Sequence, residues 1–305
     1  MYTLRRWVTI VVPLGILVLI GGMLLHAGAF GITLFCFLPA LAGGLGAIIF
    51  DAKSRTKAAT LGMLTTLVGC FSFVAVGLDG MLCVLMSLPL ALPLGALGGV
   101  VAHQLTRTRA QTANLMLAAI PLVGGGSLGW DTLAKPPVRP VVTTIEIAAT
   151  PQQVWQHVVE FPDLAAPAEW YFRAGLAYPK RARIVDGIRY CEFSTGPFVE
   201  PITTWDEPRL LAFDVTGNPQ PMREWSPYEQ IDPKHLHGYM ESERGEFRLT
   251  PIAGGRATRL QGTTWYRHGL WPDTYWRLWS DAIIHRIHLR VLQHIKTLAE
   301  KEQKQ

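Results

Sequence analysis

The sequence turns from a strand pattern into a helix pattern within the stretch Ile145-Glu146-Ile147-Ala148-Ala149-Thr150-Pro151-Gln152-Gln153-Val154-Trp155. The alternating, β-branched residues 141–147 predict a strand that ends just before this change. Thr150 can cap a helix, Pro151 suits the first helical position, and Gln153 completes a capping box. The stretch therefore predicts a strand followed at once by a helix.

The rest of the second half continues as strands separated by turn signals. The first helix is expected to stop before Pro162, and a second short helix is expected over 165–172. Six further strands are expected at 182–185, 188–194, 198–205, 210–215, 239–249 and 257–266. A long helix with an apolar stripe is expected from Asp273 to about Glu300. The predicted order is thus β, α, α, six β, α.

This order, together with three local strings, resembles the SRPBCC superfamily of START-like, polyketide cyclase/dehydrase-like domains. The strings are the 145–155 stretch, Phe161-Pro162-Asp163, and Trp205-Asp206-Glu207-Pro208-Arg209-Leu210-Leu211. The resemblance covers about 141–300. It implies an α+β helix-grip fold, in which a seven-stranded antiparallel sheet wraps a long C-terminal helix and encloses an apolar cavity. Such cavities hold sterols, lipids, polyketides or other hydrophobic ligands. The superfamily shares no catalytic set, so the resemblance implies no catalytic residue.

Residues 1–130 have the composition of a membrane region. Long apolar stretches at 7–25, 32–50, 58–78 and 81–102 each approach the ~20 residues that a spanning helix needs. A fifth stretch, 113–130, is shorter and contains Pro121. We therefore expect an all-α transmembrane bundle of four to five helices, a Pro-rich linker at 131–140, the soluble domain at 141–300 and a tail at 301–305.

The basic residues predict how this region would lie in a membrane. Seven of the 28 Lys/Arg and two of the 23 Asp/Glu occur before Asp131, so the net charge of +5 belongs to this half. The basic residues precede the first stretch and fill the loops after the second and fourth, which predicts a cytoplasmic N-terminus. Five spans then place the soluble domain outside the cytoplasm. If the fifth stretch does not span, that domain is cytoplasmic.

Three other interpretations fit the sequence of the first half less well. A cleaved signal peptide fits the first stretch only loosely, because its apolar run is long. A transporter usually needs charged groups in mid-span, and none occurs there. The GxGxxG match at 124–129 is followed by a Pro-rich linker instead of a helix, which argues against a nucleotide site. Gly43, Gly44, Gly46, Gly95, Gly98 and Gly99 are expected to let helices approach closely.

Candidate ligand-binding residues come from the aromatic and apolar positions expected to face the cavity. They are Trp170, Tyr171, Arg189, Phe193, Trp225, Tyr228, Trp265, Trp279, Ile283 and Ile287. Arg189 shares a strand face with Phe193 and could bind an acidic ligand group, although a solvated strand edge also accounts for it. The loop 216–238 is long enough to be a lid.

No metal, cofactor or nucleic-acid partner is predicted. His235 and His237 with Asp232 lack a clear further ligand, and the soluble half has no excess of basic charge. Cys191 is expected to be a buried strand residue. Three functions remain open: a membrane-anchored binding protein for a hydrophobic or lipid-like ligand, a polyketide cyclase/dehydrase-type enzyme, and a structural or regulatory module for another membrane protein.

Overall fold

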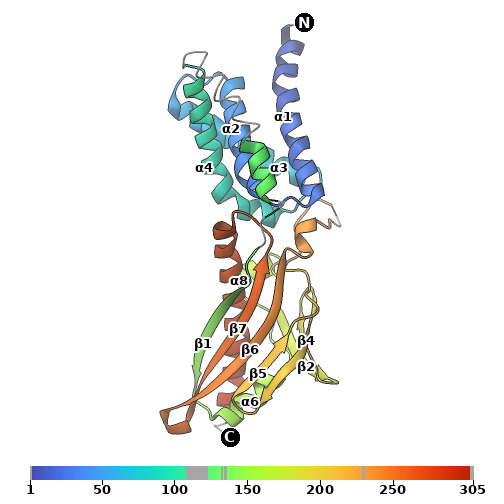
Figure 1. Ribbon diagram of the computed structural model, residues 1–305, viewed down its shortest axis with the longest axis vertical. Coiled ribbons are helices and arrows are strands. Elements are labelled where there is room, and N and C mark those ends of the chain that lie inside the picture. Colours follow the sequence, from blue (N-terminus) through green and yellow to red (C-terminus); the bar gives the residue numbers. More distant parts are fainter. Residues whose placement is uncertain (1, 108–122, 132, 134–135, 229–230, 303–305) are drawn as a thin grey trace. The chain divides into compact units, whose positions relative to one another are not determined.

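The computed structural model describes residues 2–107, 123–131, 133, 136–228 and 231–302. The chain divides into two compact units (Figure 1). The helical unit comprises Met1–Lys135, Glu224–His235 and Leu270–Trp276. The sheet unit comprises Pro136–Arg223, Leu236–Gly269 and Arg277–Gln305. Two short segments from the second half of the sequence therefore belong to the unit formed by the first half.

The described part of the helical unit contains four long helical stretches and a shorter one. Helix α1 covers Tyr2–Ala27, and a π-helical turn at Thr33–Phe37 continues into α2 at Leu38–Ile49. Helices α3 and α4 cover Arg55–Ala75 and Met81–Leu105. Of the fifth predicted span, residues 113–122 lie outside the described residues and 123–130 are helical.

Glycine lets α2, α3 and α4 pack backbone to backbone. A Cβ atom added at Gly43 would lie 2.0 Å from the carbonyl oxygen of Gly95, and one at Gly98 would lie 1.9 Å from that of Ala40. Gly62 on α3 approaches the Gly95 carbonyl in the same way, at 2.3 Å. Any larger residue at these positions would force the helices apart, which confirms the expected role of the glycines on α2 and α4.

Two of these helices have the dimensions of membrane spans. By length and composition, α3 and α4 could cross a bilayer, whereas Val11–Ala27 and Thr33–Ile49 are shorter apolar helices. Four stretches were expected to span the membrane, at 7–25, 32–50, 58–78 and 81–102. Among the described residues, the structure supports a full span for the last two of these. The described part of the fifth stretch, 113–130, does not form a helix of spanning length.

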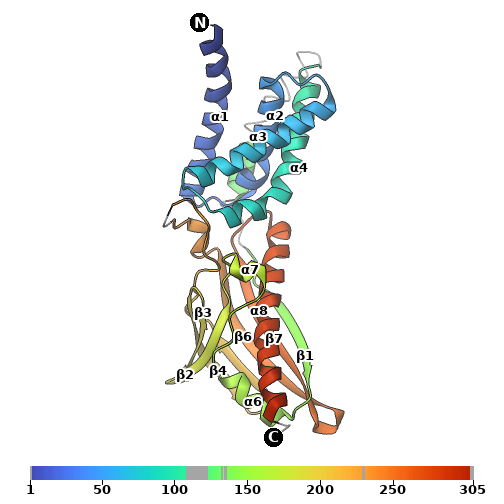
Figure 2. The same ribbon diagram turned by 180° about the vertical axis from the view of Figure 1, so that it is seen from behind.

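The sheet unit is one antiparallel sheet of seven strands in the order β1-β7-β6-β5-β4-β3-β2. The strands are β1 Arg139–Ile147, β2 Pro179–Val185, β3 Ile188–Phe193, β4 Gly196–Asp206, β5 Leu210–Asp214, β6 Met240–Ile252 and β7 Ala257–His268. The long helix α8, Asp273–Glu302, runs along the curled sheet (Figure 2). This arrangement is the helix-grip fold expected from the sequence.

The main core of this unit lies between the sheet and the two helices that cover it. Val291, Leu292, Ile295 and Ala299 of α8 pack with buried residues of α6, Pro151–Val159, and of the strands. The predicted start of α6 is present, because the Thr150 N–H donates to Gln153 Oε1 at 3.0 Å.

One local prediction was wrong. The helix expected over 165–172 is reduced to α7, Trp170–Arg173, because Pro167 lacks the N–H that a continuous helix would need. The loop 216–238 divides between the two units, since Glu224–His235 belongs to the helical unit while the residues before and after it belong to the sheet unit. The role of this loop as a lid stays a prediction.

Candidate functional site

An apolar cavity of about 130 Å³ lies inside the sheet unit, between the sheet and α8. Its apolar walls come from strands β3 to β6 and from one face of α8: Ala177, Cys191, Phe193, Phe198, Phe213, Val215, Phe247, Ile283, Ile284, Ile287 and Val291. The segment 218–222 contributes a further side. The cavity is smaller than the ~300–1,000 Å³ expected for a lipid-sized ligand, because four phenylalanine rings occupy part of the space.

A buried ion pair lines this cavity. Arg189 on β3 and Glu200 on β4 lie directly opposite each other in the antiparallel register. Arg189 is only 1% exposed and Glu200 6%, and the Arg189 Nη1 group donates to Glu200 Oε2. Charges buried this deeply are tolerated in a protein interior because each neutralises the other. The alternative of a solvated strand edge for Arg189 is therefore wrong.

Aromatic rings surround the guanidinium group of Arg189. Its Cζ atom lies 5.8, 5.3 and 5.4 Å from the ring centres of Phe161, Phe213 and Phe247. These distances are in the range of cation–π attraction. The Nη2 atom is buried and has no hydrogen-bond partner among the described residues. The Nη2 group of Arg189 is thus a hydrogen-bond donor without an acceptor, and it lies beside a mainly apolar cavity.

Burial also shifts the acid–base properties of two other cavity residues. It raises the pKa of Glu200 above its usual value, although the charge of Arg189 opposes this shift. Burial raises the pKa of the Cys191 thiol to about 12. Cys191 is therefore a neutral thiol near pH 7, which agrees with its expected role as a buried strand residue and not as a nucleophile.

His288 of α8 supplies a neutral polar group to the cavity wall. Its Nδ1 lies 3.0 Å from Thr143 Oγ1 and its Nε2 lies 2.8 Å from Thr264 Oγ1. Burial, followed by the neighbouring His285, lowers the pKa of His288 to about 4. The two threonine hydroxyls hold the ring in place, so His288 connects α8 to strands β1 and β7.

The structure brings four of the predicted ligand-binding residues to the cavity. They are Arg189 and Phe193 from β3 and Ile283 and Ile287 from α8. The strand alternation and the helical stripe that selected them are both present. Whether they contact a ligand remains a prediction.

The other six do not line the cavity in the part of the chain described. Trp170 is 76% exposed, and Tyr171 stacks against Arg286 with Cζ at 4.9 Å from its ring centre. Trp265 stacks against Arg244 at 4.1 Å, and Trp279 is half-buried on α8.

Trp225 and Tyr228 belong to the helical unit. There, the Trp225 carbonyl accepts a bond from Met81 N at 2.8 Å, and the Tyr228 hydroxyl donates to the Ala75 carbonyl at 2.6 Å.

Sequence reasoning missed Glu200, the partner of Arg189. The signal that could have found it is the short turn between Phe193 and Gly196, which are paired across the hairpin. Counting back from that pair places Arg189 opposite Glu200. The expected strands at 188–194 and 198–205 placed the turn between them slightly too far along the chain to give this register.

Comparison with known proteins gives a match to one family. Residues 139–274 match the family described as polyketide cyclase / dehydrase and lipid transport. No curated protein matches the chain.

Among solved structures, an uncharacterised protein from Bacillus thuringiensis is similar at 12% identity and a TM-score of 0.34, over 52% of this chain and 97% of the other. A norcoclaurine synthase point mutant from Thalictrum flavum is similar at 12% identity and a TM-score of 0.35, over 56% of this chain and 99% of the other. Over less than half of the chain, the sequence is thus similar to the polyketide cyclase / dehydrase and lipid transport family.

Proposed function

We propose that the sheet unit binds a small hydrophobic molecule in the cavity beside Arg189, within a chain that the helical unit anchors in a membrane. The observation that carries this proposal is a charged pair buried in an otherwise apolar hollow. Apolar walls favour ligand burial by roughly 25 cal/mol for each Å² removed from water. The family matched by this domain, which includes lipid transport, supports the same class of ligand.

The cavity limits the size of the ligand. A volume of about 130 Å³ is close to that of an engineered apolar cavity of about 150 Å³ that binds benzene. The ligand is thus a molecule with one ring, or the end of a longer chain whose remainder lies outside. The free Nη2 donor of Arg189 favours a ligand with an oxygen acceptor, such as a carbonyl or carboxyl group.

Native mass spectrometry of the full chain after gentle extraction tests this proposal. We expect a bound small molecule in the wild type and its loss in Ile287→Phe, which fills the cavity from α8. Leu278→Phe is the matched control, because Leu278 lies on the same helix but is exposed. A ligand retained equally by both variants would contradict binding in this cavity.

A cyclase or dehydrase-type enzyme is the second candidate, and Glu200 is the observation that favours it. A cavity carboxyl with a raised pKa is suited to donating or accepting a proton. Glu200→Gln would then abolish turnover of a bound ligand while binding persists. If the wild type releases the ligand chemically unmodified and Glu200→Gln binds it equally well, binding alone is supported and catalysis is not.

A further inference from the structure

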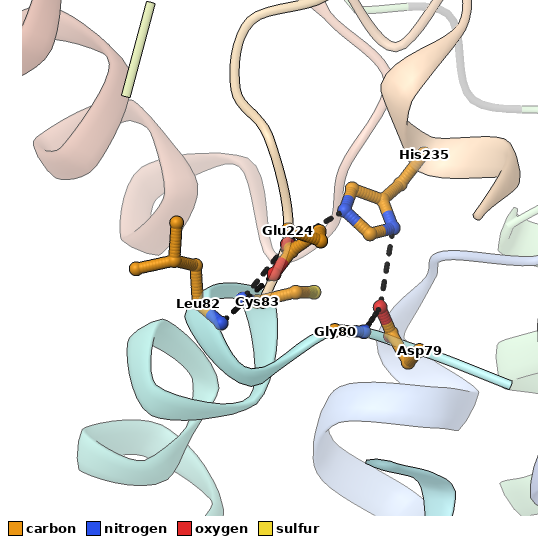
Figure 3. A network of polar contacts seen from close by, with 6 residues as sticks. All are labelled: Asp79, Gly80, Leu82, Cys83, Glu224 and His235. Carbon is orange, nitrogen blue, oxygen red and sulfur yellow. Dashed lines mark hydrogen bonds and ion pairs between the residues drawn. The ribbon is translucent and has the colours of Figure 1, made fainter. Parts of the chain in front are cut away.

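A second group of polar side chains lies in the helical unit. It contains Asp79 from the loop before α4, Cys83 from the first turn of α4, and Glu224 and His235 from the later segment that joins this unit (Figure 3). One potential ligand atom from each of the four residues lies within 4.8 Å of those of the others. Carboxylate, thiol and imidazole groups together are a common donor set for transition metals.

The cluster is held by short contacts on each side of the His235 ring. His235 Nε2 lies 3.2 Å from Glu224 Oε1, and His235 Nδ1 lies 3.4 Å from Asp79 Oδ1. The Cys83 side chain points toward the space below the ring (Figure 3). Both carboxylates and the thiol thus face a single imidazole.

These side chains are removed from solvent. Asp79, Cys83 and His235 are each buried, and the Glu224 side chain is 0% exposed. Burying two carboxylates costs free energy unless positive charge or hydrogen bonds compensate them. One imidazole is the only cationic side chain that an ion-pair contact brings to Asp79 or Glu224 among the described residues.

Helix capping explains only part of the arrangement. Glu224 accepts bonds from Leu82 N at 2.9 Å and from Cys83 N at 3.0 Å, at the start of α4. Asp131 does the same for another helix, accepting from Ile32 N at 2.7 Å and Thr33 N at 3.0 Å. A carboxylate at a helix N-terminus is stabilised by such bonds alone. Capping therefore requires neither the thiol nor the imidazole beside Glu224.

A buried nitrogen without a hydrogen bond supplies the independent sign of a ligand. His235 Nδ1 is buried and has no hydrogen-bond partner among the described residues, because its contact with Asp79 lacks hydrogen-bond geometry. Buried polar atoms without a partner are rare and usually indicate a bound ion, water or functional role. This nitrogen faces Asp79 Oδ1, one of the two carboxylates of the cluster, at 3.4 Å.

We propose that Asp79, Cys83, Glu224 and His235 form a binding site for a divalent transition metal ion of the zinc class. Zn²⁺ takes four ligands at ~2.0–2.3 Å, so neighbouring ligand atoms in its site lie about 3.3–3.7 Å apart. In the structure the potential ligand atoms are up to 4.8 Å apart, so the side chains would have to move together by about 1 Å to reach the distances of a zinc site. The cysteine sulfur favours zinc over magnesium or calcium, which prefer oxygen ligands.

Metal binding to the full-length protein tests the proposal. The purified chain is treated with a chelator, loaded with Zn²⁺, washed and measured by elemental mass spectrometry. We expect about one Zn²⁺ per chain. Cys83→Ser and His235→Gln should each weaken the affinity by at least about tenfold. The matched controls Cys36→Ser and His237→Gln change the same residue types outside the cluster, and they should bind as the wild type does.

Co²⁺ loading separates lost ligation from lost folding. A cysteine ligand gives Co²⁺ a thiolate charge-transfer band in the near ultraviolet, and we expect this band in the wild type and in Cys36→Ser but not in Cys83→Ser. Circular dichroism of the metal-free variants checks that their helices are intact. Absence of Zn²⁺ from the wild type, or equal affinity in folded Cys83→Ser, would overturn the proposal and leave the cluster as a helix-capping ion pair.

Discussion

Replacing Glu200 with Gln tests the buried pair of the sheet unit most directly. The change keeps the shape of the side chain but removes the charge opposite Arg189, whose guanidinium group is 1% exposed. Removing one partner of a buried pair costs roughly 3–5 kcal/mol, because the other charge stays buried without compensation. This is a large part of the ~5–15 kcal/mol that stabilises a typical domain.

The reverse change is expected to cost less. In Arg189→Met the remaining Glu200 can bind a proton, since burial already raises its pKa. The double variant Arg189→Met/Glu200→Gln leaves no uncompensated charge in the cavity. The double variant should therefore lose less stability than the two single variants lose together, by at least about 2 kcal/mol.

Hydrogen–deuterium exchange measures these costs in the full chain, where two units make a single melting temperature hard to interpret. The amides of β3 and β4 pair around Arg189 and Glu200, so they report opening of this part of the sheet. A loss of 3 kcal/mol accelerates their exchange about 100-fold or more. Exchange that changes less than about fivefold in Glu200→Gln, or costs that simply add, would refute the reasoning.

Three further predictions follow from other contacts. The pKa of His288 is lowered to about 4 in the folded state, so the unfolded state binds more protons between about pH 6.5 and pH 4. The free energy of unfolding should therefore fall by up to about 3 kcal/mol as the pH is lowered from about 6.5 to 4. Urea titrations should show a smaller fall in His288→Gln. Gly95→Val should separate α3 from α4, because an added Cβ there meets Thr66 at 2.1 Å, and should lower the thermal stability of the helical unit, whereas Gly69→Val, where an added Cβ meets nothing within 4 Å, should not. Cys191 should resist a thiol-specific reagent at pH 8 until the sheet unit unfolds, because it is buried and its pKa is about 12; rapid labelling of the native chain would contradict this.

The fold of the sheet unit was predictable because its signals are local. The bond from Thr150 N to Gln153 starts α6 where the sequence indicated, and turn residues separate the strands. The cavity residues on one face of β3 and on one stripe of α8 could be predicted from the two-residue period of a strand and the 3.6-residue period of a helix alone. The size of the cavity did not, because it depends on how four phenylalanine side chains pack in three dimensions.

The cluster around His235 could not be predicted for a different reason. His235 was considered with Asp232 and His237, its neighbours in the loop, and no metal site was expected. The residues that complete the cluster are far away in sequence: Glu224 bonds to Cys83 N across a separation of 141 residues. No periodicity or spacing rule links such positions, and the loop 216–238 gave no sign that it divides between two units.

That division has a consequence for how the chain is made. Helices α3 and α4 emerge from the ribosome early, but Glu224 and His235 are translated only after β1 to β5. At ~5–20 residues per second, this delay is on the order of ten seconds. During it, Asp79 and the free N–H groups of Leu82 and Cys83 must find other partners, such as water or a chaperone. The helical unit, whose helices are translated first, is thus completed only after much of the second half has been translated.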